Sequence, residues 1–135
     1  MIRSTTRLKA LWAGCALALL APLTLPAAHA AAPTHRRAEA TAFVHELAAG
    51  QFAQAEARFD AQMRMHASPA KLKKLWHYMQ KQFGPYARTD GSNSMSLRGH
   101  PMVIVRTMFK RQTVGLAVFF DDARKIDGLR VVPIR

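Results

Sequence analysis

Carboxylates near the C-terminal end are the first groups in this sequence that could do chemistry. The stretch AVFFDDARKIDGLRVVP places Asp121 and Asp122 side by side after an apolar run, and Asp127 follows shortly after them. Carboxylates that converge on one substrate atom can act as general acid and general base. Adjacent strand residues, however, point to opposite faces of a sheet, and a turn aspartate commonly bonds backbone N–H groups further along the turn. The pattern therefore indicates that Asp121 and Asp122 turn the chain.

Three other side chains are candidate ligand-binding groups. Asp60 follows Phe59 at the edge of an apolar helical stripe, where it either borders a pocket between helices and sheet or is a solvent-facing or helix-bonding group. Trp76 is expected in the core, with an indole N–H that needs a partner. Arg106 interrupts the apolar run MVIVRTMF. It is expected either at a wet end of the sheet or inside a pocket that binds an anion.

The sequence lacks the motifs of the common catalytic centres. It has no G-x-S-x-G elbow, no P-loop and no G-x-G-x-x-G. After residue 30 it has no cysteine, and no two histidines stand three or four residues apart, the spacing at which one helix could hold a metal. We expect no cofactor and no metal, and a non-catalytic binding module. The alternative is a small isomerase or lyase that uses Asp60 as its base.

The first thirty residues have the three parts of a secretory signal peptide. MIRSTTRLK carries three cations and no acid, ALWAGCALALLAPLTL is an apolar run too short to span a bilayer comfortably, and PAAHA ends in small residues. The sequence predicts cleavage after Ala30. Lipidation at Cys15 is an alternative, although Trp12 stands where a small aliphatic residue is expected. A small exported chain without disulfides favours a bacterial source and a periplasmic or secreted location.

The chain that remains after cleavage is strongly basic. The full sequence has 20 Lys and Arg against 8 Asp and Glu, and the signal segment removes three cations and no acid, which leaves a net charge of +9. Export argues against nucleic acid as the partner. The available counterparts are anionic lipid head groups, lipopolysaccharide phosphates or an acidic partner surface.

Hydrophobic spacing predicts the elements that position these residues. After a flexible arm at residues 31–37, apolar residues recur at helical spacing over about Ala38–Ala49, Phe52–His66 and Pro69–Phe83. Runs rich in Val, Ile and Phe then predict strands at Met102–Phe109, Thr113–Phe120 and Lys125–Ile134, with weaker strands around Gly91. Residues 38–135 are thus predicted to form one α+β domain, a cystatin-like roll in which three helices pack on a curved antiparallel sheet of about four strands.

Both faces of this sheet are predicted to be apolar. Val103 and Val105 alternate along one strand with Met102, Ile104 and Met108. Three helices can cover one face, and a chain this short has nothing left for the other. We therefore expect a homodimer or a partner protein on an uncovered face formed by some of these five residues, and the sequence leaves open which face that is.

Three segments together resemble a bacterial domain of unknown function. They are ATAFVHELAAGQFAQAEARFDAQM, SPAKLKKLWHYMQKQFGPY and LAVFFDDARKIDGLRVVP. That domain is often found ahead of α/β-hydrolase (dienelactone-hydrolase-like) domains, or alone behind a signal peptide, and is similar to the nuclear-transport-factor-2-like, or cystatin-like, superfamily. Its motifs match Phe59–Asp60, Trp76 and the hairpin Asp122–Leu129, with Asp121 inserted. The resemblance implies a sheet that wraps around helices and leaves a pocket, and no set of catalytic residues carries over.

Overall fold

The computed structural model describes residues 28–135 of the chain. Four helices come first, followed by four strands. The helices are α1 (Ala28–Ala48), α2 (Phe52–Ala57), α3 (Ala61–His66) and α4 (Pro69–Phe83). The strands are β1 (Tyr86–Leu97), β2 (His100–Phe109), β3 (Thr113–Phe120) and β4 (Ile126–Pro133).

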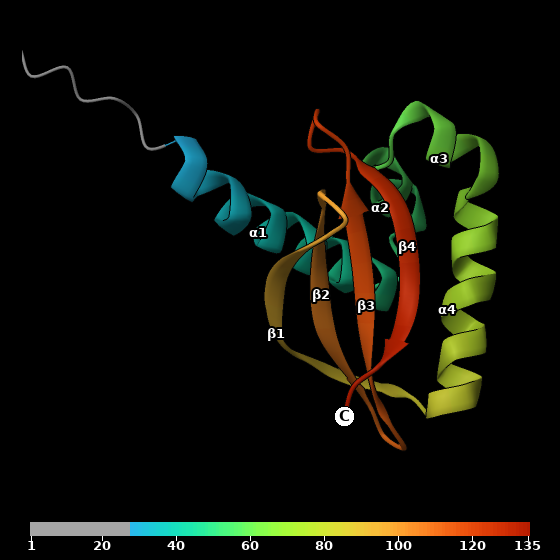
Figure 1. Ribbon diagram of the computed structural model, residues 1–135. Coiled ribbons are helices and arrows are strands. Elements are labelled where there is room, and N and C mark those ends of the chain that lie inside the picture. Colours follow the sequence, from blue (N-terminus) through green and yellow to red (C-terminus); the bar gives the residue numbers. More distant parts are fainter. Residues whose placement is uncertain (1–27) are drawn as a thin grey trace, which may run out of the picture.

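The four strands form one antiparallel sheet in the order β1-β2-β3-β4. Short links join the successive strands, which is why neighbours in sequence pair as hairpins. In Figure 1 the sheet lies in front of α1, and α4 runs beside β4. Within residues 28–135 the helices thus lie to one side of the sheet, and none of them covers its other face. This architecture confirms the α+β class and is consistent with a cystatin-like roll.

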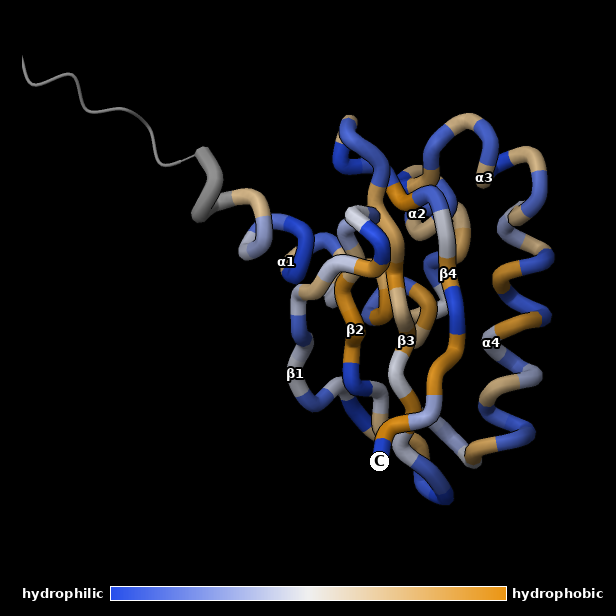
Figure 2. Tube along the Cα trace, in the orientation of Figure 1, coloured by the Kyte–Doolittle hydropathy of each residue, from blue (hydrophilic) through white to orange (hydrophobic). Residues whose placement is uncertain are grey.

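The hydrophobic core lies between the helices and the sheet face that they cover, here called the inner face. Figure 2 shows hydrophobic residues concentrated along β2 and β3. The helices contribute the buried residues Phe43, Val44, Leu47, Leu72, Trp76 and Met79, and the strands contribute Val103, Val105, Phe109, Val114, Leu116, Val118 and Phe120. Each strand residue of the core is followed by one on the opposite face, as the two-residue period of a strand requires.

Helix α1 begins earlier than the sequence predicts. Residues 31–37, expected as a flexible arm, form part of this helix, which spans Ala28–Ala48 in the described range. The alanines at this end have the highest helix propensity of any residue, and the Ser94 hydroxyl donates a hydrogen bond to the Pro33 carbonyl at 3.2 Å, which ties the helix to β1. The predicted signal segment lies outside the described residues, except for its last three.

The single helix predicted over Phe52–His66 is two short helices. The chain breaks at Phe59, whose side chain is buried and packs on the Phe43 ring at a centroid distance of 5.6 Å. The backbone there bridges to the start of β4: Asp60 N donates to Ile126 O, and Ile126 N donates to Arg58 O, both at 2.9 Å. These bonds to the sheet replace the helical bonds that the same groups would otherwise make.

Candidate functional site

Asp60 is a helix cap. It stands immediately before α3, and one of its carboxylate oxygens accepts a hydrogen bond from the Met63 backbone N–H at 2.7 Å. Such a bond satisfies one of the free N–H groups at the start of a helix. The half-buried carboxylate therefore has a structural use at the junction between α2 and α3.

Trp76 lies in the core, as expected. It is 3% exposed and sits in an aromatic cluster, with ring centroids 5.5 Å from Tyr86 and 5.6 Å from Phe109. This cluster lies where β2 ends and β1 begins, whereas Asp60 lies against the start of β4. The two residues are therefore not brought together.

Arg106 lies on the face of the sheet opposite to the core, here called the outer face. Its Nε is 3.7 Å from a carboxylate oxygen of Asp90, and both side chains are about half exposed. The pair lines a groove of about 520 Å³ that runs between the bulged part of β1 and the C-terminal end of β4. Arg106 is thus separated from Trp76 by the thickness of the sheet.

Two of the five predicted interface residues are not accessible. Val103 and Val105 are both 0% exposed, because they point into the core beneath α1. A partner cannot reach them, and their inclusion in an interface is wrong. Met102, Ile104 and Met108 alternate with them and therefore lie on the outer face, where each is partly exposed.

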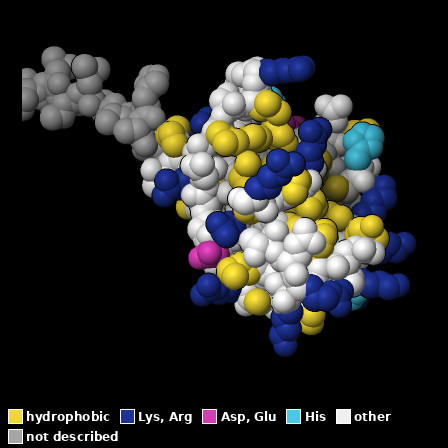
Figure 3. All heavy atoms as spheres, turned by 60° about the horizontal axis from the view of Figure 1, so that its bottom comes forward, with side chains coloured by type: hydrophobic (Ala, Val, Ile, Leu, Met, Phe, Trp, Pro, Cys, Tyr) yellow, Lys and Arg dark blue, Asp and Glu magenta, His cyan; other side chains and the backbone are white. Residues whose placement is uncertain are grey.

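The outer face carries an apolar strip that crosses β2, β3 and β4. The side chains of Ile104 and Val132 pack over Gly115. A Cβ placed on this glycine would lie only 2.8 Å from a methyl carbon of each. Phe119, which is opposite Met102 in the register, extends the strip toward the other end of the sheet. Figure 3 views this face obliquely and shows a hydrophobic patch that Lys and Arg side chains cross.

A histidine–aspartate pair lies on the same face. His100 Nε2 is 3.0 Å from the Asp127 carboxylate, and the imidazole ring packs on Phe119 at a centroid distance of 5.7 Å. The two residues line a shallow cleft of about 340 Å³ with Arg130. No local pattern in the sequence pairs them, because they are separated along the chain by the whole of β2 and β3.

A second group that sequence spacing does not reveal is the ion-pair network of Arg58. Its guanidinium donates two hydrogen bonds to Glu46, at 2.7 and 2.8 Å, and one to Glu39. The bonds to Glu46, opposed by partial burial and reinforced by the charge of Glu39, raise the pKa of Arg58 above its usual range. The network joins the end of α2 to α1 and lines a cleft of about 510 Å³ beside the β3–β4 hairpin.

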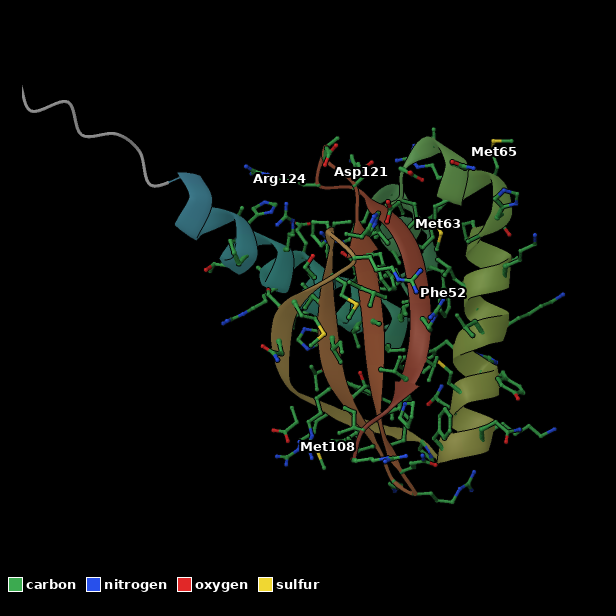
Figure 4. All side chains as sticks on the ribbon, in the orientation of Figure 1. Phe52, Met63, Met65, Met108, Asp121 and Arg124 are labelled. Atoms are coloured by element: carbon green, nitrogen blue, oxygen red, sulfur yellow. The ribbon has the colours of Figure 1, made fainter. Side chains whose placement is uncertain are left out.

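The carboxylates at that hairpin turn the chain. Asp121 accepts a hydrogen bond from the Lys125 backbone N–H at 2.8 Å, and its own N–H donates to the Lys125 carbonyl at 2.9 Å. Figure 4 shows Asp121 and Arg124 together at the hairpin tip. The interpretation of Asp121 as a turn residue is confirmed.

Two kinds of feature were not found within residues 28–135. No group of three or more His, Cys, Asp and Glu side chains in this range could hold a metal ion. No helix of this range is long and apolar enough to cross a membrane.

The comparisons with known proteins identify the family. A family model with the description "Protein of unknown function (DUF3887)" matches residues 40–129, about two thirds of the chain. The matched range contains the bridge between Phe59 and Ile126 and the whole aromatic cluster around Trp76. Neither the curated proteins nor the solved structures include a match. The chain belongs to the family of proteins of unknown function DUF3887.

Proposed function

We propose that this protein is an exported, non-catalytic interaction module that self-associates through the outer face of its sheet. The observation that carries the proposal is the apolar strip of Met102, Ile104, Phe119 and Val132, which no helix of the described chain covers. Burying apolar surface is the main favourable contribution to most protein association. An uncovered apolar sheet face is therefore the best-supported place for a partner.

A second copy of the chain suits this face better than an unrelated partner. In a twofold-symmetric contact the same patch meets itself, so its charges must be complementary to one another. The strip has cations and acids at its borders: the Arg106–Asp90 pair at one end, and Arg130 beside the His100–Asp127 pair at the other. A cation of one copy can thus meet an acid of the other.

Export and the wider relationship of the fold also belong to this proposal. Cleavage after Ala30 would make Pro33 the third residue of the mature chain. Pro33 stands inside α1 when the helix starts at Ala28. If cleavage made the helix start at Ala31, Pro33 would lie in its first turn, where the N–H groups have no helical partner and a missing N–H costs no hydrogen bond. The position of Pro33 therefore supports cleavage after Ala30.

The superfamily that we propose is the nuclear-transport-factor-2-like, or cystatin-like, one, in keeping with the roll architecture.

Light scattering across a concentration series tests self-association. We expect the wild-type molar mass to correspond to a dimer, and Ile104→Asp to give a monomer with an unchanged circular dichroism spectrum, because an aspartate would be buried without a partner in the interface. Met65→Asp places the same charge on an exposed side chain of α3 and should leave the dimer intact.

Other results would contradict the proposal. A wild-type monomer at every concentration would exclude self-association. Dissociation by Met65→Asp as well as Ile104→Asp would place the contact elsewhere. A monomer whose outer-face groove beside Arg106 binds a small molecule would make the face a ligand site.

A further inference from the structure

The charges of this protein are segregated along the chain. Residues 61–120 contain ten Lys and Arg and a single acid, Asp90. Most of the other carboxylates are occupied within the fold: Glu39 and Glu46 by Arg58, Asp60 by the start of α3, and Asp121 by the β3–β4 turn. The cations of α4 and of the β2–β3 hairpin therefore have no acid near them in sequence.

Helix α4 presents a continuous basic stripe. Lys71, Lys74, Tyr78 and Lys81 follow one another at spacings of three and four, which places all four on one side of the helix. All are exposed, and this side is opposite to the buried Leu72, Trp76 and Met79. The stripe from Lys71 to Lys81 is about 15 Å long, at 1.5 Å per residue.

The β2–β3 hairpin extends this stripe as a fixed platform. The Arg111 guanidinium donates to the Lys81 carbonyl, the Arg111 backbone N–H donates to Phe83 O at 2.9 Å, and the Lys110 backbone N–H donates to Pro85 O at 2.9 Å. The hairpin approaches Gly84 so closely that a Cβ there would lie 3.1 Å from Arg111 N. Two backbone hydrogen bonds and the Arg111 guanidinium thus hold the hairpin against the C-terminal end of α4, beside Lys81.

Exposed apolar groups accompany these cations. Within the described range, Met65 and Tyr78 are the two most exposed large hydrophobic side chains, at 78% and 61%. Tyr78 lies within the basic stripe, and Figure 4 shows Met65 directed outward from α3, the helix that precedes α4. Lys and Arg with flanking amphipathic side chains are typical of surfaces that lie on anionic lipid, where the aromatic ring enters the head-group region.

We propose that the α4 stripe and the β2–β3 hairpin dock this protein on a membrane surface through anionic phospholipid head groups. The exposed Met65 and Tyr78 favour lipid over a soluble polyanion, because a nucleic-acid backbone offers no apolar layer for them. Figure 3, which brings this end of the molecule forward, shows several Lys and Arg side chains projecting from its lower and right-hand edges. The docking surface is distinct from the outer face of the sheet, so a self-associated form would display two copies of it.

Vesicle co-sedimentation of the full chain tests the proposal. The vesicles are phosphatidylcholine alone and phosphatidylcholine with phosphatidylglycerol. We expect binding to the anionic vesicles that falls steeply with added salt. The double variant Lys74→Gln/Lys81→Gln should bind about 30-fold more weakly, since each cation near an anionic surface contributes about 1 kcal/mol and 1.4 kcal/mol is tenfold.

A matched variant distinguishes an effect of the stripe from an effect of the total charge. Arg124→Gln/Lys125→Gln removes the same charge from the β3–β4 hairpin, and its affinity should stay within about twofold of wild type, because this hairpin lies at the end of the sheet opposite to the β2–β3 hairpin. Tyr78→Ala should weaken binding as well, because the ring no longer enters the lipid.

Three outcomes would overturn the proposal. Equal losses in the two double variants would mean that only net charge matters. Equal binding of wild type and Lys74→Gln/Lys81→Gln to anionic vesicles would mean that residues outside the stripe, such as the N-terminal segment, hold the lipid. In a parallel titration with a DNA duplex, a Lys74→Gln/Lys81→Gln variant that lost DNA binding but kept vesicle binding would make the stripe a site for soluble polyanions.

Discussion

The acidic side chains of this protein act mainly within the fold. Asp60 caps a helix, Asp121 closes a turn, and Glu46 holds Arg58 with two hydrogen bonds. Carboxylates used in this way accept hydrogen bonds from specific N–H groups, which holds a helix start, a turn and the contact between α2 and α1 in place. The surplus of basic side chains therefore gives the surface its positive charge.

The capping role of Asp60 leads to a prediction. Asp60→Ala should lower the free energy of unfolding by about 1 kcal/mol, because the Met63 N–H loses its acceptor. Asp60→Ser, which keeps an oxygen acceptor at the cap, should restore most of that loss. Urea unfolding measures both. If Asp60→Ser were as unstable as Asp60→Ala, the cap would not be what the carboxylate contributes.

At the scale of elements, the backbone bridge between Phe59 and Ile126 joins two segments that are distant in the sequence. The Phe59–Asp60 pair and the C-terminal hairpin are far apart in the sequence, and two reciprocal backbone hydrogen bonds hold them together. The matched family range includes both partners. These residues therefore attach the helices to the end of the sheet.

The junction between α4 and the β2–β3 hairpin gives a second prediction. Gly84 and Gly50 both have positive φ, which strains any other residue, and Gly84, at φ 91° and ψ 173°, lies in a region that essentially only glycine adopts. Only Gly84 is also close to another segment, because a Cβ there would lie 3.1 Å from Arg111 N. Gly84→Ala should therefore lower the free energy of unfolding by about 1–2 kcal/mol more than Gly50→Ala. Thermal or urea unfolding of the two variants compares them, and equal losses would show that the close approach is tolerated.

At the scale of the whole molecule, the protein has two separate surfaces with different chemistry. The outer face of the sheet is apolar with mixed charges at its borders, which suits a second copy. The α4 stripe and the hairpin beside it are basic with exposed Met65 and Tyr78, which suits anionic lipid. Association through the first surface would bring two copies of the second together, and two linked contacts bind a surface more tightly than one.

Export gives the third prediction, also at this scale. After expression in a bacterium, the periplasmic fraction should contain a species whose N-terminal residue is Ala31, as read by N-terminal sequencing or intact mass. Changing Ala28 and Ala30 to Leu should leave the precursor uncut, because the peptidase accepts only small residues there. A full-length protein confined to the cytoplasm would contradict the prediction.

Local sequence patterns were sufficient for several elements. Ser68 and Pro69 mark the start of α4 and Gly84 its end, because capping and φ restrictions act over a few residues. The alternation along β2 and β3 predicted two apolar faces. The break at Phe59 could not be predicted in this way, since the groups that replace its helical bonds belong to β4.

The sequence by itself determined the α+β class, the strand pattern, the turn at Asp121 and the excess of cations, because composition and short-range spacing control each of these. Only the tertiary structure decided which sheet face is covered. It alone paired His100 with Asp127 and Arg58 with Glu46, and it separated Asp60, Trp76 and Arg106. The physical reason is that these relations depend on strand register and helix packing, which bring together residues that no local pattern links.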